Sequence, residues 1–367
     1  MVCAALLHSF SSTLANLPVQ DYVPSGRYIA GLQGVGAVGC LGAALAVVGF
    51  RPLPRRCLLV QALLAVAGNA IPLVISTWPG LLLGRLLQGL SSPFPIAIRF
   101  LTLCAAIHLK QSYWLCILTG SLIGLFLSPS LSQAISLTSL PLPLSLGLCA
   151  GGWVLLSGGV YVYFPECRRE ETMGVGPFVQ SVWSPWLAGW TVAVCRMAVE
   201  AVITLSPILL GQIFNWDNWL IALLLASCQA LNLYLLLLVY ASTTLFSTLT
   251  KATFILVPGA LVACCSPNFP IGIAFSTVLI SMSGPLSDLG AFAYFSTVYP
   301  KSEGRWLIAG QFGAVSGNCL VWIYLSSPAT AWPSVFLPIF LLSLAVAGLL
   351  SLRMLLRPTP RHNNDRN

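Results

Sequence analysis

The chain has 367 residues, of which 57% are hydrophobic and only 7% charged, and its mean hydropathy is +0.89. A soluble domain carries about a quarter charged residues because water must wet its surface, so this composition excludes a water-soluble globular protein. The net charge of +8 does not indicate nucleic-acid binding, because the basic residues stand singly or in small groups between apolar runs.

Twelve apolar runs follow one another along the chain, and we predict that each is a membrane-spanning helix. A span needs about 20 apolar residues to cross a hydrocarbon core of roughly 30 Å, and continuous runs favour helices over the alternating strands of a barrel. The runs are Val2–Leu17, Tyr28–Phe50, Cys57–Ser76, Gly80–Leu103, Tyr113–Leu131, Leu144–Phe164, Trp186–Phe214, Trp219–Tyr240, Ala252–Cys265, Ile271–Phe295, Trp306–Ser326 and Val335–Leu355. No basic leader or cleavage site marks the first run as a signal peptide, so we expect it to be the first helix.

The basic residues between the runs predict how the chain is oriented. With a cytoplasmic amino terminus, the inside segments hold Arg51, Arg55, Arg56, Lys110, Arg168, Arg169, Lys251, Lys301, Arg305, Arg353, Arg357, Arg361 and Arg366. The outside segments hold only Arg27. Because basic residues favour the cytoplasmic side, we predict a multi-pass protein of the plasma membrane, or of the inner membrane if it is bacterial, with both termini in the cytoplasm.

The longest inside connection, 165–185, divides the runs into two equal groups. It predicts an N-terminal six-helix bundle over 1–164 and a C-terminal six-helix bundle over 186–356, followed by a cytoplasmic tail over 357–367. The connection is either a plain solvated loop or a hinge between the bundles. The fold class is therefore an all-α membrane protein with twelve transmembrane helices in two six-helix bundles.

Four ionisable residues inside the predicted spans are candidates for a functional site: Arg85, Arg196, Glu200 and Asp288. A charge at mid-bilayer costs about 2.5–3.5 kcal/mol, so it persists only where it is paired or reached by water. Arg196 and Glu200 lie four residues apart on one helical face and can form an ion pair. That pair is either purely structural or makes Glu200 a proton acceptor.

The other two residues also allow two interpretations. Asp288 follows Gly284 and Pro285, a sequence that is tolerated in a span beside a cavity. It is either hydrogen-bonded to neighbouring serines or a facing helix, or it is a proton-coupling site. Arg85 is either an anchor that reaches the membrane interface or a cavity residue. The twelve cysteines have no metal or redox spacing, so we expect no metal and no cofactor.

Three stretches resemble motifs of the major facilitator superfamily. The stretch 84–89 reads Gly-Arg-Leu-Leu-Gln-Gly and resembles the family's fourth-helix signature, which in this chain places Arg85, Gln88 and Gly89. A second stretch resembles the small-residue and proline pattern of the family's exporters, with Gly120, Gly124, Ser128 and Pro129. In a third, the loop motif between the second and third helices, the chain keeps the basic residues Arg51, Arg55 and Arg56 and lacks the usual Asp.

The resemblance implies a secondary transporter that moves a small solute by alternating access, with protons as the coupling ion. Glu200 or Asp288 would receive the proton, and Arg85 or Arg196 would face an anionic group of the solute. The basic loop residues would act at a gate, and Gln88, Gly89, Gly120, Gly124 and Pro129 would form helix contacts. The exporter-like pattern favours efflux, and the resemblance implies a monomer that is not an enzyme.

Two other classes of protein remain open at this point. A transporter-like scaffold or receptor without transport would account for the missing loop Asp. A multi-pass lipid-modifying enzyme would need acids or histidines clustered at one membrane face, which the short loops do not provide. The chain has no phosphate-binding Gly-x-x-x-x-Gly-Lys-Ser/Thr loop, so ATP does not power it directly.

Overall fold

The computed structural model describes residues 1–14, 26–50, 53–75, 77–104, 107–138, 140–163, 183–241, 247–266, 269–298, 304–326 and 333–355. Its regular elements in these residues are all helices: α1 (Val2–Leu14), α3 (Gly26–Phe50), α4 (Pro54–Val74), α5 (Trp78–Leu90), α6 (Phe94–Cys104), α7 (Ile107–Ser136), α8 (Pro141–Tyr163), α9 (Pro185–Gln212), α10 (Asn218–Ala241), α11 (Ser247–Cys265), α12 (Pro270–Val298), α13 (Arg305–Ser326) and α14 (Pro333–Leu355).

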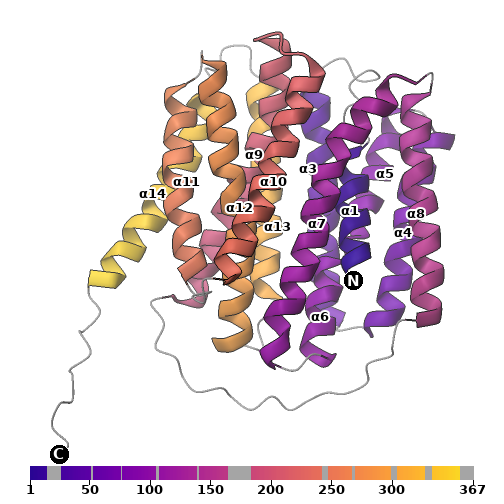
Figure 1. Ribbon diagram of the computed structural model, residues 1–367, viewed down its shortest axis with the longest axis horizontal. Coiled ribbons are helices and arrows are strands. Elements are labelled where there is room, and N and C mark those ends of the chain that lie inside the picture. Colours follow the sequence, from indigo (N-terminus) through magenta and orange to yellow (C-terminus); the bar gives the residue numbers. More distant parts are fainter. Residues whose placement is uncertain are drawn as a thin grey trace, which may run out of the picture.

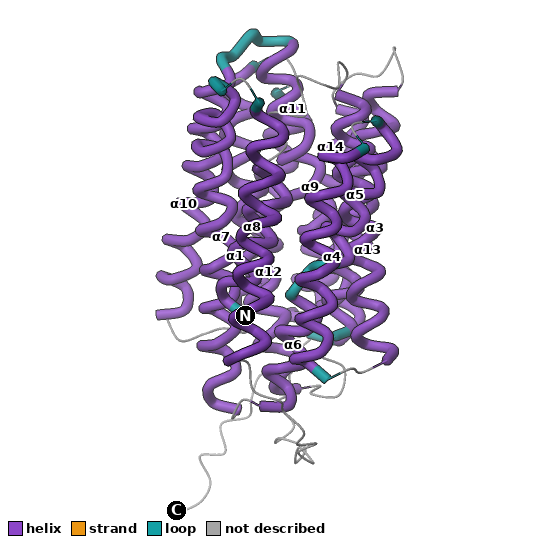
Figure 2. The backbone as a smooth tube through the Cα atoms, turned by 90° about the vertical axis from the view of Figure 1, so that its right-hand side faces the viewer, coloured by secondary structure: helices purple, strands orange, loops and turns teal. Residues whose placement is uncertain are grey.

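Each of the twelve apolar runs is helical over most of its described residues, and the predicted all-α membrane fold is confirmed. Within the described residues, eleven segments are long and apolar enough to cross a membrane, and α1 contains a shorter apolar helix. The helices run roughly parallel, with their connections gathered at two ends (Figure 2). Residues 165–182 of the central connection, Arg51 and the tail fall outside the described residues, so their predicted roles stay predictions.

The fourth span is interrupted, although the sequence predicts one continuous helix there. α5 ends at Leu90 and α6 begins at Phe94, because Pro93 has no N–H and disfavours helical geometry in the residue before it. The Nε2 of Gln61 on α4 donates a hydrogen bond of 2.6 Å to the carbonyl of Ser92 at the break. The carbonyl of Ser92 lies at the break in the helix and thus gains a hydrogen bond within the protein, which a backbone polar group inside a membrane requires.

The helices form two groups that lie side by side (Figure 1). α1 to α8 make one group and α9 to α14 the other, and similar pairs recur in both: α1 packs on α7 as α9 packs on α13, and α4 packs on α8 as α11 packs on α14. Two pairs of long helices join the groups, α3 with α13 and α7 with α10. The space between the groups is therefore bounded by these four helices.

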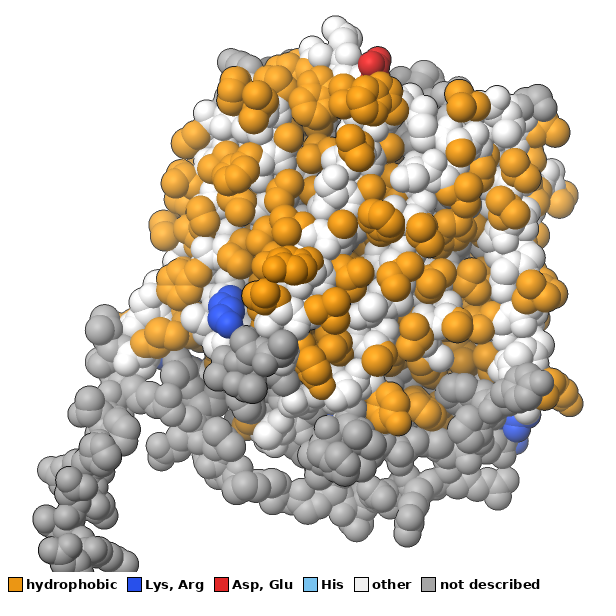
Figure 3. Space-filling model, in the orientation of Figure 1, with side chains coloured by type: hydrophobic (Ala, Val, Ile, Leu, Met, Phe, Trp, Pro, Cys, Tyr) orange, Lys and Arg blue, Asp and Glu red, His pale blue; other side chains and the backbone are white. Residues whose placement is uncertain are grey.

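The outer surface has the apolar character that a lipid environment requires. Hydrophobic side chains cover most of the face in Figure 3, and the Lys and Arg side chains visible there lie only towards the lower end. That is the end where α8 finishes and α9 begins (Figure 1). Charges at the end of the spans and an apolar middle are typical of a protein that crosses the bilayer.

Candidate functional site

A cavity of about 300 Å³ lies between the two groups of helices. Its lining comes from α1, α3, α5, α6, α7, α9, α10, α12 and α13, whereas α4, α8, α11 and α14 contribute none of the lining residues. The volume is at the lower end of the range of pockets that hold small organic ligands. Arg85, Arg196, Glu200 and Asp288 all line it. The structure thus brings together the four ionisable residues that the sequence marks as candidates.

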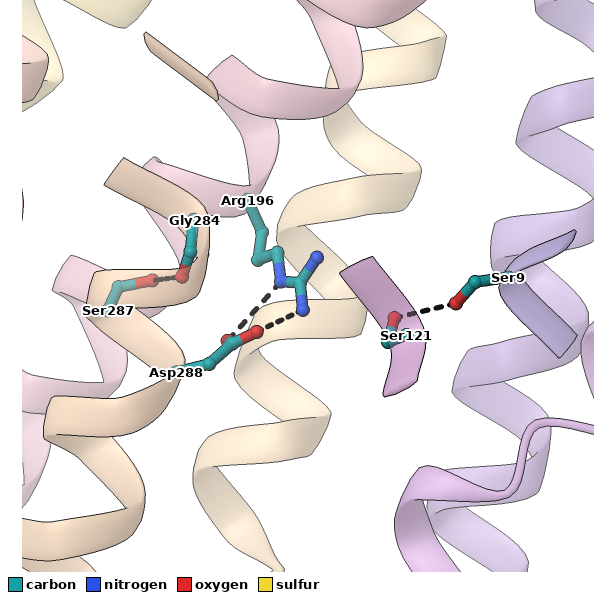
Figure 4. Close-up of polar contacts among 6 residues, drawn as sticks. All are labelled: Ser9, Ser121, Arg196, Gly284, Ser287 and Asp288. Atoms are coloured by element: carbon teal, nitrogen blue, oxygen red, sulfur yellow. Dashed lines mark hydrogen bonds and ion pairs between the residues drawn. The ribbon is translucent and has the colours of Figure 1, made fainter. Parts of the chain in front are cut away.

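An ion pair joins two neighbouring helices at the cavity wall. Arg196 of α9 and Asp288 of α12 meet through both oxygens of the carboxylate, with 3.3 Å between Nε and Oδ1 and a second, closer contact from the other guanidinium nitrogen to Oδ2 (Figure 4). The Asp288 side chain is 4% exposed and the Arg196 side chain 28% exposed. Two-point pairing fixes the plane of the guanidinium. The pair therefore holds α9 against α12 while Arg196 remains open to the cavity.

The ion pair predicted between Arg196 and Glu200 is wrong as to the partner. In an α-helix, side chains lean towards the amino-terminal end, so an acid placed four residues before a base pairs better than the reverse order. Here Arg196 precedes Glu200, and the guanidinium turns to the facing helix instead. Glu200 still lines the cavity, within electrostatic range of Arg196 and beside Asn318 of α13.

The charged partner of Asp288 is Arg196 of α9, which the residues next to Asp288 in the sequence did not indicate. The nearby hydroxyl of Ser287 donates to the carbonyl of Gly284 at 2.7 Å, within α12 (Figure 4). Of the two structural interpretations of Asp288, the one with a facing helix is therefore correct.

Arg85 lies on the other side of the cavity, in a chain of hydrogen bonds. Its guanidinium donates to the carbonyl of Ser12 on α1 at 2.8 Å and to Oε1 of Gln88 at 3.0 Å. Gln88 in turn donates from Nε2 to Oδ1 of Asn69 on α4 at 2.9 Å. Arg85 is 7% exposed and Asn69 fully buried. The structure thus places Arg85 at the cavity rather than at the membrane interface, with hydrogen bonds to α1 and to Gln88 of its own helix.

The predicted helix-contact residues lie where helices approach closely. An added Cβ at Gly89 would lie 2.9 Å from Cα of Gly39, and one at Gly124 would lie 3.1 Å from the backbone nitrogen of Phe10. Gly120 lies in the same contact between α1 and α7, where a Cβ added to it would lie 2.8 Å from the carbonyl oxygen of Val2. These glycines allow backbones to pack where any side chain would separate them.

The remaining predicted residues are divided between the cavity and the lower end. Pro129 and Gln88 line the cavity. Arg55 donates to the carbonyl of Tyr161 at 2.5 Å and lies 5.7 Å from the centre of its ring, so it ties the start of α4 to the end of α8 within one group. Arg56 is exposed. Any gate role for these arginines stays a prediction.

Some cavity residues were not predicted as site residues from the sequence. Gln229 and Asn232 of α10 line the cavity and hydrogen-bond to each other at 3.2 Å. Their polarity within an apolar run was a usable signal, but amides in spans commonly serve only to join helices. Trp114 and Trp306 also line the cavity. They had no distinguishing signal, because Trp near the end of a span usually indicates the membrane interface.

No protein-family profile and no curated protein matches the chain. Solved structures do match it. The crystal structure of the human organic anion transporter MFSD10 (TETRAN) has a TM-score of 0.68 and 13% sequence identity, with 95% of this chain and 97% of that chain covered. The crystal structure of the nucleoside transporter NupG has a TM-score of 0.62 and 10% identity, with 97% of each chain covered.

Both structural neighbours are transporters rather than enzymes. The similarity extends over nearly the whole chain, so it concerns the complete arrangement of spans and not a single bundle. At this level of sequence identity it establishes the fold. This chain has the fold of the major facilitator superfamily transporters.

Proposed function

We propose that the protein is a secondary active transporter that moves a small solute by alternating access, with the cavity between the helix groups as the binding site. The observation that carries the proposal is the gathering of Arg85, Arg196, Glu200 and Asp288 at one cavity between the two helix groups. Charged groups inside a bilayer are retained where they border a solute pathway. The transporter fold supports the same conclusion.

Charge on the cavity wall favours a solute with an anionic group. Arg85 lines one side of the cavity, where it donates to the carbonyl of Ser12 and to Gln88, so it brings a positive charge to the wall. Arg196 remains 28% exposed to the cavity while it pairs with Asp288. One structural neighbour is described as an organic anion transporter and the other as a nucleoside transporter. Organic anions and nucleosides are therefore the first solutes to test.

The proton-coupling role falls to Asp288 or Glu200. Protonation of Asp288 would release Arg196, which could then turn to Glu200 or to the anionic group of a solute. Protonation of Glu200 would change the charge that Arg196 experiences without breaking its pair with Asp288. Efflux is the proposed direction, on the pattern of Gly120, Gly124 and Pro129 in α7. The cytoplasmic placement of both termini follows from the distribution of basic residues.

Flux into proteoliposomes tests the proposal. We expect labelled organic anions or nucleosides to accumulate when a pH gradient is imposed, and not without it. Arg85→Gln should raise KM for an anionic solute at least about tenfold, whereas the exposed Arg56→Gln should not. Whichever of Asp288→Asn and Glu200→Gln abolishes gradient-driven uptake while preserving solute exchange identifies the proton acceptor.

Two results would contradict the proposal. The first is that no solute of either class moves. The second is that substitution of Arg196, Glu200 or Asp288 leaves cellular function intact, which would favour a scaffold or receptor that retains the transporter fold.

A further inference from the structure

An aromatic cluster closes the lower end of the cavity and joins the two helix groups. The rings of Trp114 (α7) and Phe292 (α12) stack with 4.9 Å between centroids and 16° between planes. The ring of Trp306 (α13) meets Trp114 edge to face at 5.8 Å and 88°. All three side chains are at most 1% exposed. Trp114 and Trp306 belong to the cavity lining, whereas Phe292 lies behind them.

The cluster is placed where the two groups must separate if the lower end is to open. Trp114 lies near the start of α7, Phe292 near the end of α12 and Trp306 at the start of α13, and these helix ends lie at the lower end in Figure 1. Close by, the hydroxyls of Ser112 (α7) and Tyr240 (α10) are 2.5 Å apart. Two contacts from α7 thus cross between the groups at this level, one aromatic and one polar.

The closed cluster leaves two hydrogen-bond donors without acceptors. The indole Nε1 atoms of Trp114 and Trp306 are buried and have no hydrogen-bond partner within the described part of the protein. Buried Trp N–H groups usually find a partner, and Tyr294, one turn of α12 or less from Phe292, does donate its hydroxyl to the carbonyl of Trp183 at 2.8 Å. Unmet buried donors weaken the state that buries them.

We propose that Trp114, Phe292 and Trp306 form the gate at the lower end of the cavity, and that the two unmet indole N–H groups bias this gate towards opening. When the gate opens, water or an acceptor on the solute reaches both N–H groups and the closed state loses its advantage. The stacked rings keep the gate closed until then. The gate is the moving part of the alternating access proposed above, and it rests on that function.

Cysteine accessibility tests the gate without any solute. The reporter is Ala291→Cys in the full chain in nanodiscs, because Ala291 is fully buried and lies three residues beyond Asp288, one turn nearer the lower end. Alkylation by N-ethylmaleimide is measured at that peptide by mass spectrometry. Ala62→Cys, equally buried in α4 away from the cavity, reports general unfolding.

Three substitutions give distinct expected results. Trp114→Ala should raise alkylation of the reporter at least about tenfold and leave the control cysteine unchanged. Benzothienylalanine at position 114 keeps the ring shape and replaces N–H with sulfur, so it should lower alkylation about fivefold or more. The same replacement at Trp153, another buried indole without a partner and outside the cavity lining, should not change it.

The outcomes separate the gate from the transport function. If Trp114→Ala leaves the reporter as protected as before, these residues are not a gate. If benzothienylalanine at position 114 does not slow alkylation, the N–H groups do not bias it. A gate that behaves as expected in a protein that moves no solute would overturn transport and leave the gate standing. Gradient-driven flux of a solute, together with alkylation of the reporter that Trp114→Ala does not change, would refute the gate and leave the transport function standing.

Discussion

Removing the carboxylate of Asp288 should destabilise the fold more than removing any other carboxylate at the cavity. Asp288→Asn keeps the shape of the side chain and deletes the charge that Arg196 pairs with. Breaking a fully buried ion pair from one side costs about 3–5 kcal/mol, because the remaining charge is left without compensation. Arg196 is 28% exposed, so cavity water stabilises the orphaned guanidinium in part. We therefore expect a loss of about 2–3 kcal/mol.

Thermal unfolding of the purified protein measures this loss. For a chain of this size, such a loss corresponds to a decrease in Tm of about 2–5 °C. Glu200→Gln should cost less than half as much, because Glu200 does not hold the guanidinium. Asp217→Asn, which alters an exposed carboxylate ahead of α10, should have no measurable effect.

A double-mutant cycle isolates the pair itself. Arg196→Met and Asp288→Leu are measured alone and together. Each single variant leaves one charge of the pair without its partner, whereas the double variant removes both, so it should be more stable than the sum of the two single losses predicts. The opposite ranking, in which Glu200→Gln destabilises as much as Asp288→Asn, would mean that the guanidinium pairs within α9 after all. The assignment of the partner across the helices would then be refuted.

Three further substitutions test the close packing of the helices and the orientation of Arg85. Gly89→Ala should destabilise the protein by about 3 kcal/mol, because the added Cβ would meet the backbone of α3. Gly151→Ala, whose Cβ would point into open space, should be neutral or stabilise the protein by up to about 1 kcal/mol. The Tm values of the two variants are compared, and equal shifts would contradict the prediction. Asn69→Leu should cost about 1–3 kcal/mol, because Gln88 loses its 2.9 Å hydrogen bond to Oδ1 of Asn69 and keeps only the longer one, 3.5 Å, to the carbonyl of Gly68. It should also weaken binding of anionic solutes more than of neutral ones in calorimetry, a difference that a merely structural residue would not produce.

The helices were predictable because each obeys a local rule. A continuous apolar run of about 20 residues has one stable conformation in lipid, so every span could be located from composition alone. The interruption at Pro93 had only a weak local signal, because a proline often ends a helix but α7 and α12 continue through Pro129 and Pro285. It was missed because the apolar character continues through the break. The structural cause of the interruption is nevertheless encoded within a few residues.

The contacts of the site were not predictable in the same way. Arg196 and Asp288 are 92 residues apart, and no sequence rule relates their helices. The local rule for residues four apart favoured Glu200 as the partner, but that rule also depends on the order of acid and base, which is unfavourable here. The aromatic cluster was even less predictable from the sequence, because its three residues come from three helices. What the sequence could indicate was that ionised groups in lipid must share a wet space.

The distribution of strong and weak contacts fits a rocking motion of the two helix groups. The ion pair of Arg196 and Asp288 joins α9 to α12, both in the second group, so it does not tie the groups together. Across the boundary lie aromatic stacking at Trp114, one hydroxyl contact at Ser112, and the packing of α3 on α13 and α7 on α10. Aromatic pairs and single hydrogen bonds contribute about 0.5–1.5 kcal/mol each, whereas a buried ion pair broken from one side costs several times more. A protein whose halves were locked by that ion pair would lose it in every cycle. Here a rocking motion would not by itself separate Arg196 from Asp288, because both belong to one group, and the pair would open only on protonation of Asp288. The boundary between the groups consists of contacts that can break and reform at low cost.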